Sequence, residues 1–479
     1  MNKVTYNLNE FHAKDVHMHS KILDFINSEY DLGADALDSM RHILHNVGVR
    51  DMDQCLEHLK IISNPKYYPF TNKKVMENIL HDGGLSMREG FQKWIKDVQE
   101  NKIPTLSKIQ NNYLGDNLAP SKGDVIYENH IIELIHYKPL CRDIYKEPLL
   151  ISPPWINKYY ILDINKEQSF VQYCLKEGID VFIISWKSAT YIDIDIGLED
   201  YIIKGVEKSV SIINKPLHLL GFCVGGLAAL IASIRNNHTQ IKSLSLLATP
   251  VDFSHLHQMK QFITNENYSL YVDKIMSKGY QSGDDLFKMF CLLKSESLIF
   301  KNMVDQYYLN KEPIENDILY WNMDSINIPA KLHLEYLEKF LLKNQLIQGQ
   351  YSIEQKKINI NNLTLPTFVV ATEKDHIVPP ASALALRTNG NNVEYILGGS
   401  GHIAGIINPP TQNKYHFSTY CHEKQQIVKH DGSWWGNWSS WIVKKMGGKH
   451  LAQKNDTFET LRPAPGKYAM NQINLNKYS

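Results

Sequence analysis

The pattern of apolar and polar positions divides the chain into a helical first part and a second part in which strands and helices alternate. Up to about residue 120, apolar residues recur at helical spacing with charged residues between them. From 125 to 250, short apolar runs typical of buried strands, such as 131–135, 148–151 and 181–186, alternate with helical segments. This alternation indicates a mostly parallel sheet. The sequence therefore predicts a helical N-terminal region, residues 1–120, followed by an α/β domain, residues 121–479.

One cysteine lies where a buried strand meets a buried helix. Cys223 is part of the sequence Gly221-Phe222-Cys223-Val224-Gly225-Gly226, with the apolar run 216–220 before it and the small-residue run 227–234 after it. A strand, a nucleophile between glycines and a helix form the nucleophile elbow of the α/β-hydrolase fold. The glycines permit the sharp turn, and the helix N-terminus favours a thiolate. The alternative is a buried core cysteine in a glycine-rich turn.

An acid and a histidine follow Cys223 in the order that the α/β-hydrolase fold requires. The strand predicted at 365–371 leads into a loop that contains Asp375, the candidate acid. A strand predicted at 393–397, the last of the sheet, leads into a glycine-rich loop that contains His402, the candidate base. Glu373 and His376 are the competing residues in the acid loop. The sequence therefore predicts a catalytic triad of Cys223, Asp375 and His402.

Two backbone amides are needed to stabilise an oxyanion at such a site. One is expected from Val224, the residue after the nucleophile. The other is expected from the loop after the strand at 148–151, where two prolines, which cannot donate, precede Trp155 and Ile156. We assign Val224 and Ile156 to the oxyanion hole, with Trp155 as the alternative to Ile156.

Between the nucleophile and the acid, residues 253 to 350 become helical and rich in aromatic residues. Enzymes of the α/β-hydrolase fold carry a cap over the active site at this position, so we expect a helical cap at about 253–350 that excludes water. The tryptophan-dense segment 432–441 is either a contact surface or a packed helix. The tail, about 445–479, is proline-rich near residues 461–468. The predicted fold class is α/β: an α/β-hydrolase fold with a helical cap and a helical N-terminal region.

Composition and the apolar segments indicate which partners and which cellular compartment to expect. Lysine plus arginine and aspartate plus glutamate number 51 each, so no strong field attracts nucleic acid. Six scattered cysteines without a CxxC pair indicate free thiols in a reducing compartment and no zinc site. Residues 1–20 contain no apolar segment of a secretory signal. The apolar stretch 217–234 is divided by glycines, so we expect no transmembrane segment.

Several stretches, from about residue 65 to the tail, carry a resemblance to one family. They are residues 125–129, 137–140, 153–163, 221–226, 375–379, 400–405, 432–435 and 463–468. In these the sequence resembles the polyhydroxyalkanoate synthases. The Phe222 and Val224 that flank Cys223 resemble the class I, single-subunit type, which prefers short 3-hydroxyacyl groups. The N-terminal region looks shorter than in typical class I members, and its first 60 residues match poorly.

The resemblance implies polymerisation of (R)-3-hydroxyacyl-CoA, with 3-hydroxybutyryl-CoA as the expected substrate, through an acyl group on Cys223 and with release of CoA. It implies no metal or other cofactor, a homodimer, and a location in the cytoplasm on the surface of polyester granules. The sequence leaves open whether His402 alone or the Asp375–His402 pair activates the hydroxyl. Two alternatives remain: an intracellular polyester depolymerase or acyl-CoA thioesterase with a cysteine nucleophile, and a non-catalytic granule-associated protein.

Overall fold

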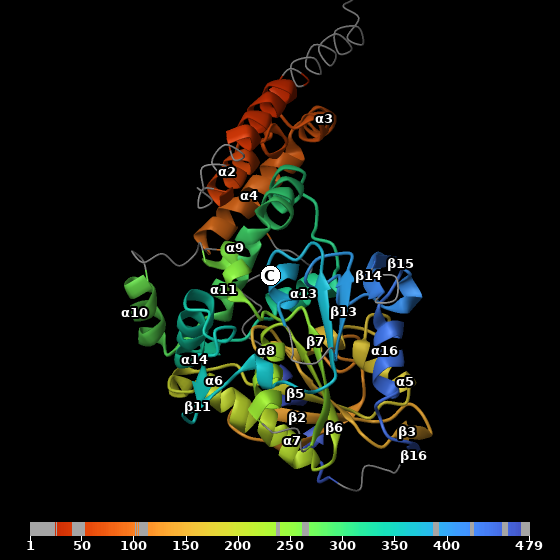
Figure 1. Ribbon diagram of the computed structural model, residues 1–479. Coiled ribbons are helices and arrows are strands. Elements are labelled where there is room, and N and C mark those ends of the chain that lie inside the picture. The colour runs from red at the N-terminus through yellow and green to blue at the C-terminus, as the bar shows by residue number, and fades with distance from the viewer. Residues whose placement is uncertain are drawn as a thin grey trace, which may run out of the picture. The chain divides into compact units, whose positions relative to one another are not determined.

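A mixed sheet is the centre of the larger unit of the chain in the computed structural model (Figure 1). The structure describes residues 24, 26–40, 53–100, 102, 104, 114–235, 240–260, 268–386, 392–421, 426–452 and 458–470. Among these residues the sheet has eleven strands in the order β15-β14-β13-β12-β7-β6-β4-β5-β2-β1-β17. The strands from β13 to β5 run parallel, whereas those at both edges are antiparallel to their neighbours.

The central strands are almost wholly buried, which explains their continuous apolar runs. Along the chain the sheet strands are β1 (Gly123–Glu128), β2 (Ile132–Tyr137), β4 (Leu149–Ser152), β5 (Val181–Trp186), β6 (Leu217–Phe222), β7 (Ile241–Leu247), β12 (Thr367–Thr372), β13 (Val393–Gly398), β14 (His416–Cys421), β15 (Gln426–Asp431) and β17 (Arg462–Pro463). The strands predicted at 131–135, 148–151, 181–186, 216–220, 365–371 and 393–397 are confirmed within two residues at each end.

One prediction about the sheet is wrong: the strand at 393–397 is not the last. The hairpin β14–β15 follows the loop that contains His402 and extends the sheet beyond β13. Its outer strand, β15, alternates between exposed and half-buried positions and has no fully buried residue. Phe417 in β14 is buried, but lysine and histidine are interspersed through the hairpin. An edge hairpin of this kind lacks the apolar run by which the central strands were recognised.

Helices cover both sides of the sheet. In Figure 1, α8 (Val224–Arg235) lies on one side, and α5 (Phe170–Lys176) and α16 (Trp435–Val443) lie on the other. The tryptophan-dense segment forms the start of α16 and is packed inside, because the Trp438 indole donates a hydrogen bond to the Ser245 hydroxyl at 2.9 Å and the Trp441 ring lies 5.2 Å from that of Phe368. Of the two interpretations of this segment, the packed helix is confirmed.

The region predicted to form the cap is mostly helical. Its elements in the larger unit are η5 (Phe253–His255), α9 (His257–Lys260), α10 (Tyr268–Lys278), β8 (Tyr280–Gln281), the start of α11 (Gly283–Leu293), α13 (Asp317–Met323), β9 (Ile328–Pro329), α14 (Ala330–Glu335) and η8 (Tyr336–Leu342). Residues 288–315 belong instead to the smaller unit with residues 1–108. The boundaries of the two units differ from the predicted boundary near residue 120 and from the predicted cap at 253–350. The predicted domain boundaries stay predictions.

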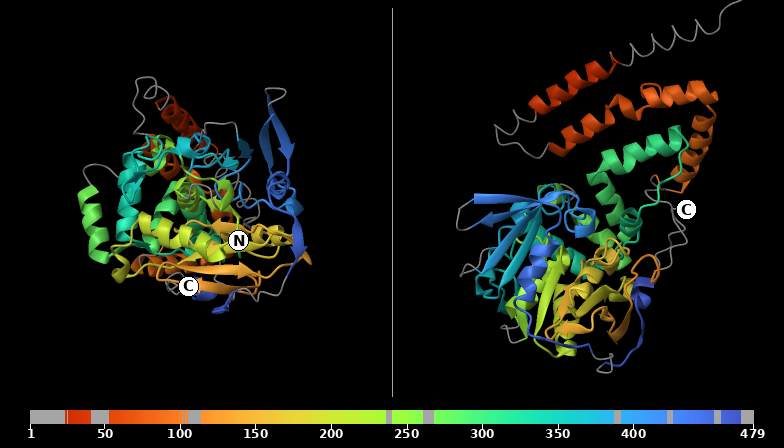
Figure 2. Two further views of the ribbon diagram at one scale, coloured as in Figure 1. Left: turned by 60° about the horizontal axis from the view of Figure 1, so that its bottom comes forward. Right: turned by 90° about the vertical axis from the view of Figure 1, so that its right-hand side faces the viewer.

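The smaller unit is helical in its described part. It contains α2 (Asp53–Ile62), η1 (Pro65–Tyr67), α3 (Lys73–Asp82), α4 (Leu85–Gln99), η6 (Glu296–Phe300), α12 (Lys301–Met303) and η7 (Val304–Tyr308); the orange helices of the right-hand view of Figure 2 belong to it. The Asn72 side chain caps α3 by accepting from the Val75 amide at 3.1 Å, and Gly83, at a φ of +66°, ends the helix. A small core of Tyr67, Val75, Val304 and Leu309 joins its two chain segments.

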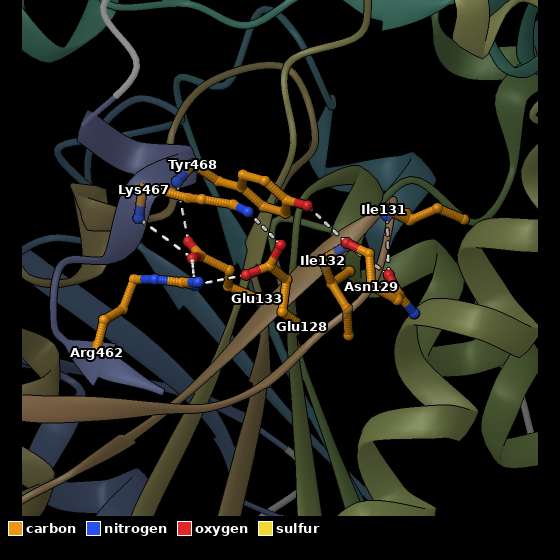
Figure 3. Close-up of polar contacts among 8 residues, drawn as sticks. All are labelled: Glu128, Asn129, Ile131, Ile132, Glu133, Arg462, Lys467 and Tyr468. Carbon is orange, nitrogen blue, oxygen red and sulfur yellow. Dashed lines mark hydrogen bonds and ion pairs between the residues drawn. The ribbon is translucent and has the colours of Figure 1, made fainter. Parts of the chain in front are cut away.

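The C-terminal segment is fixed to the first hairpin of the sheet by a buried carboxylate (Figure 3). Strand β17 pairs with β1 and is followed by α17 (Gly466–Met470). The Glu133 side chain is fully buried and accepts hydrogen bonds from the Arg462 guanidinium at 2.5 Å and from the backbone amides of Lys467 and Tyr468 at 3.2 and 2.9 Å. Among the described residues, no helix is both long and apolar enough to cross a membrane.

Candidate active site

The backbone at Cys223 has the strained geometry of a nucleophile elbow. Its φ is +52°, in the left-handed region that residues other than glycine seldom adopt. Two hydrogen bonds hold it: the Cys223 amide donates to the Leu247 carbonyl at 2.9 Å, and the Gly226 amide donates to the Cys223 carbonyl at 2.9 Å. The thiol is therefore fixed between β6 and the first turn of α8.

The glycines around Cys223 are required by close approach. A Cβ on Gly221 would lie 2.3 Å from the Gly226 Cα, and one on Gly226 would lie 1.9 Å from the Thr249 Oγ1. A Cβ on Gly225 would lie 2.2 Å from the Pro153 carbonyl oxygen. The last contact brings the start of α8 against the loop after β4, the loop that contains Ile156.

Asp375 and His402 are paired. The His402 Nδ1 lies 2.7 Å from the Asp375 Oδ2, and both side chains are buried. The carboxylate also accepts hydrogen bonds from the Thr372 hydroxyl and from the amides of Ile377 and Val378 at 2.8 to 3.0 Å. Burial acts to raise the pKa of Asp375, but the His402 imidazolium and these amides outweigh it and lower the pKa. Asp375 is held as a carboxylate that orients His402.

His402 also contacts Cys223. Burial acts to lower the pKa of His402, but the negative charges of Asp375 and of the Cys223 thiolate, with a hydrogen bond to each, raise the pKa to about 10. The ring of Phe222 stacks on the imidazole with centroids 5.4 Å apart. The structure thus brings Cys223, His402 and Asp375 together, and their roles as nucleophile, base and orienting acid stay a prediction.

The competing residues of the acid loop lie elsewhere. The Glu373 carboxylate pairs with the His416 ring at 3.1 Å, at a half-exposed position. His376 is half-buried. Asp375, by contrast, is bonded directly to His402.

The candidate nucleophile is covered. Cys223 is only 5% exposed, and Asp375 and His402 are each 6% exposed. Tyr336, at the start of η8, is close enough that the Cys223 charge adds to burial in raising the pKa of its phenol. Its ring packs against Phe253 and Phe340, with centroids 5.8 and 6.3 Å away. One aromatic residue of the predicted cap region, Tyr336, therefore lies near the thiol, and two others pack against its ring.

The loop after β4 is held on both sides. The Pro153 carbonyl accepts a hydrogen bond from the Trp186 indole at 2.8 Å, and the Trp155 side chain is buried against Trp186 and Tyr201. The Ile156 carbonyl accepts from the Ile326 amide at 3.1 Å. Val224 is the first residue of α8, so its amide has no acceptor within the helix. The assignment of Ile156 and Val224 to an oxyanion hole is compatible with this arrangement and stays a prediction.

Sequence reasoning missed a set of buried polar residues behind this loop. Lys158, Tyr160 and Asp324 form a buried cluster, and Asn157 and Trp321 bond to the same two chain segments. Tyr160 and Asp324, for example, are 164 positions apart in the chain, so no local sequence motif could have predicted that they pair. Within the described residues, no group of three or more His, Cys, Asp or Glu side chains has the arrangement of a metal site.

Comparison with known proteins gives two family matches. Residues 13–174 match the model described as the N-terminus of poly-beta-hydroxybutyrate polymerase (PhaC), and residues 211–409 match the alpha/beta hydrolase fold. The predicted α/β-hydrolase fold is thereby confirmed for the part of the chain that contains Cys223, Asp375 and His402.

Curated relatives match over most of the chain. It is 31% identical to the poly(3-hydroxyalkanoate) polymerase subunit PhaC of Rhizobium etli, over 93% of this chain and 74% of the relative. It is 32% identical to the poly(3-hydroxyalkanoate) polymerase of Methylorubrum extorquens, over 86% and 72%. With the PhaC subunit of Cupriavidus necator the identity is 31%, over 85% and 73%.

Proposed function

The chain belongs to the poly(3-hydroxyalkanoate) polymerase family of acyl-transferring enzymes, and we propose that it polymerises (R)-3-hydroxyacyl-CoA into polyester. The expected substrate is 3-hydroxybutyryl-CoA, and the expected intermediate is an acyl group on Cys223. The observation that carries this proposal is the position of Cys223 at a strained elbow, in contact with the His402 that Asp375 orients.

The first step would be acylation of the cysteine. The Cys223 thiolate attacks the thioester carbonyl, the bond between that carbon and the CoA sulfur breaks, and the His402 imidazolium gives its proton to the departing CoA sulfur. Amides of Val224 and Ile156 would bind the oxyanion. One thioester replaces another in this step, so it is nearly balanced in energy, which suits a cysteine better than a serine.

The second step would form the ester. The 3-hydroxyl of another acyl group attacks the acyl thioester and loses its proton to the neutral His402, a new carbon–oxygen bond forms, and the thiolate is released. Conversion of a thioester into an oxoester is downhill, so repetition lengthens the polymer. Asp375 would stabilise the imidazolium that appears in both steps.

The location and assembly follow from the product. An insoluble polyester would keep the enzyme at the surface of the granule that it makes, in the cytoplasm, and we expect the active form to be a homodimer. Fractionation of granules from cells that express the chain, and the mass of the purified protein with and without substrate, would test these two expectations.

The activity is tested by CoA thiol release from 3-hydroxybutyryl-CoA by the full chain, with the product extracted into solvent. Cys223→Ala should abolish release, whereas Cys141→Ala, the same change at a free cysteine outside the site, should not. Thiol release with insoluble polyester would support a polymerase. Free 3-hydroxybutyrate as sole product would indicate a thioesterase, and no release with short or long acyl groups would contradict the proposal.

A further inference from the structure

A fully buried ion pair includes Lys158, which follows Ile156 by two residues in the chain. The Lys158 Nζ is 2.8 Å from the Asp324 Oδ1, and each side chain is only 1% exposed. The Tyr160 hydroxyl, also buried, donates a hydrogen bond to the Asp324 Oδ2 at 2.7 Å. The Asp324 carboxylate therefore lies within ion-pair distance of Lys158 and accepts a hydrogen bond from Tyr160, and both of these residues follow Ile156 in the chain.

Backbone hydrogen bonds join the same two segments. The Ile326 amide donates to the Ile156 carbonyl at 3.1 Å, and Asn157 and Ser325 form an antiparallel bridge. The Trp321 indole donates to the Lys158 carbonyl at 2.7 Å. The segment from α13 to Ile326, part of the predicted cap, thus binds the loop at each residue from 156 to 158.

Hydrogen bonds hold the chain before and after the Ile156 amide. The Pro153 carbonyl accepts from the Trp186 indole in β5, and the Ile156 carbonyl accepts from the Ile326 amide. Within the described residues, the Ile156 amide itself donates to no other protein group. A loop clamped at both ends with a free amide between them is what an oxyanion hole needs, since its donors must be in place before charge develops.

A buried ion pair often adds little to the free energy of folding. The desolvation penalty of the two charges is often as large as their electrostatic attraction, so apolar residues would hold the same surfaces together at least as well. In some proteins, buried polar or charged groups restrict two segments to a single docked arrangement. The pair is therefore better explained by the position that it imposes on the loop than by stability.

We propose that Asp324 is a positioning residue for the acylation step: through Lys158 and Tyr160 it holds the loop so that the Ile156 amide meets the oxyanion. The inference rests on the proposed function and adds to it a requirement that the segment 324–326 be docked on the loop. Asp324 does not touch the substrate in this scheme and acts through the loop.

Two variants test the role. Asp324→Asn keeps the shape of the side chain and removes its charge, and Tyr160→Phe removes one hydroxyl without a change in packing. We expect Asp324→Asn to lower kcat for CoA release from 3-hydroxybutyryl-CoA by about 30-fold or more and Tyr160→Phe by about 3-fold to 10-fold, because a displaced oxyanion donor acts only in the transition state. KM should change by less than about 2-fold.

A second measurement separates positioning from general damage. Alkylation of Cys223 by iodoacetamide needs the thiolate but forms no oxyanion on a carbonyl, so its rate should stay within about 2-fold of that of the unmodified chain in both variants. Tyr468→Phe is the matched control, since it removes a hydroxyl that donates to the Asn129 carbonyl at a buried position in the C-terminal segment. It should match the unmodified chain in both assays.

The outcomes distinguish the two proposals. Unchanged kcat in Tyr160→Phe and in folded Asp324→Asn, with an active unmodified chain, would overturn the positioning role alone. Parallel loss of CoA release and of alkylation would also overturn it, because the damage would then reach the whole elbow. If Asp324→Asn fails to fold, Tyr160→Phe decides the question. An unmodified chain that releases no CoA would overturn the proposed function itself, and the positioning role with it.

Discussion

The Nδ1 atom of His402 lies 2.7 Å from the Oδ2 atom of Asp375, in a site where both side chains are buried. A carboxylate accepts and does not donate, so Nδ1 carries the proton of this hydrogen bond. The other ring nitrogen, Nε2, is thereby left for Cys223. The pair thus fixes both the direction and the tautomer of the imidazole, as an acid does in a catalytic triad.

Asp375→Asn should lower CoA release by about 100-fold to 10,000-fold, since an amide at this place can hold the wrong tautomer and cannot stabilise an imidazolium. The assay is the initial rate of thiol release at saturating 3-hydroxybutyryl-CoA. Glu373→Gln is the matched control in the same loop, because Glu373 pairs with His416 instead. Equal losses in the two variants would argue against the assignment of Asp375.

The raised pKa of His402 predicts a pH dependence of stability. The folded pKa of about 10 lies above the unfolded value of about 6.5, so the imidazolium stabilises the fold fully below about pH 6.5, and this contribution is lost as pH rises toward about 10. The free energy of unfolding of the unmodified chain, minus that of His402→Gln, should therefore fall by up to about 1.4 kcal/mol per pH unit in this window. Urea unfolding at each pH measures it, and a flat difference would contradict the prediction.

The lowered pKa of a second histidine, His333, predicts a loss of stability at acidic pH. Burial lowers the pKa of His333 in α14 to about 3, and the Tyr271 hydroxyl lies 2.8 Å from its Nε2. Because the folded pKa is below the unfolded value, the neutral ring contributes stability above about pH 6.5 that is lost as pH falls toward about 3. As pH falls from 6.5 to 4, the His333→Gln variant should therefore lose less stability than the unmodified chain. Thermal unfolding at each pH measures this loss. Equal acid sensitivity of the two chains would count against it.

The sequence was sufficient for those parts of the site that rest on local signals. Cys223 is surrounded by glycines that close approach requires. Asp375 follows a strand that is buried throughout, and His402 follows a half-buried strand and lies in a glycine-rich loop, so their order could be predicted from local signals. The hairpin β14–β15 was not predicted, because its outer strand is exposed and lacks a continuous apolar run. The pairing of Lys158 with Asp324 was not predicted either, because it depends on how distant segments dock, which no local pattern encodes.

The anchor of the C-terminal segment can be tested at Glu133. Glu133→Gln should lower the free energy of unfolding by about 1–3 kcal/mol, because the buried carboxylate accepts from a guanidinium and from two amides, and an amide cannot accept all three in this geometry (Figure 3). Glu128→Gln, which affects a half-exposed carboxylate bonded to Arg462 and Lys467, should cost less than about 1 kcal/mol. Equal costs in urea unfolding would refute the distinction between the two carboxylates.

The two adjacent glycines of the elbow differ in what blocks a side chain, and this predicts which can be rescued. A Cβ on Gly226 would meet the Oγ1, Cγ2 and Cβ atoms of the Thr249 side chain, whereas one on Gly225 would meet the backbone of Ser152 and Pro153. Gly226→Ala should therefore destabilise the fold by about 1–3 kcal/mol, and Thr249→Ala should restore part of that loss in the double variant. Gly225→Ala should displace the loop that contains Ile156, so that CoA release falls and Thr249→Ala does not restore it. Rescue of Gly225→Ala by Thr249→Ala would show that the loop after β4 is not what confines the start of α8.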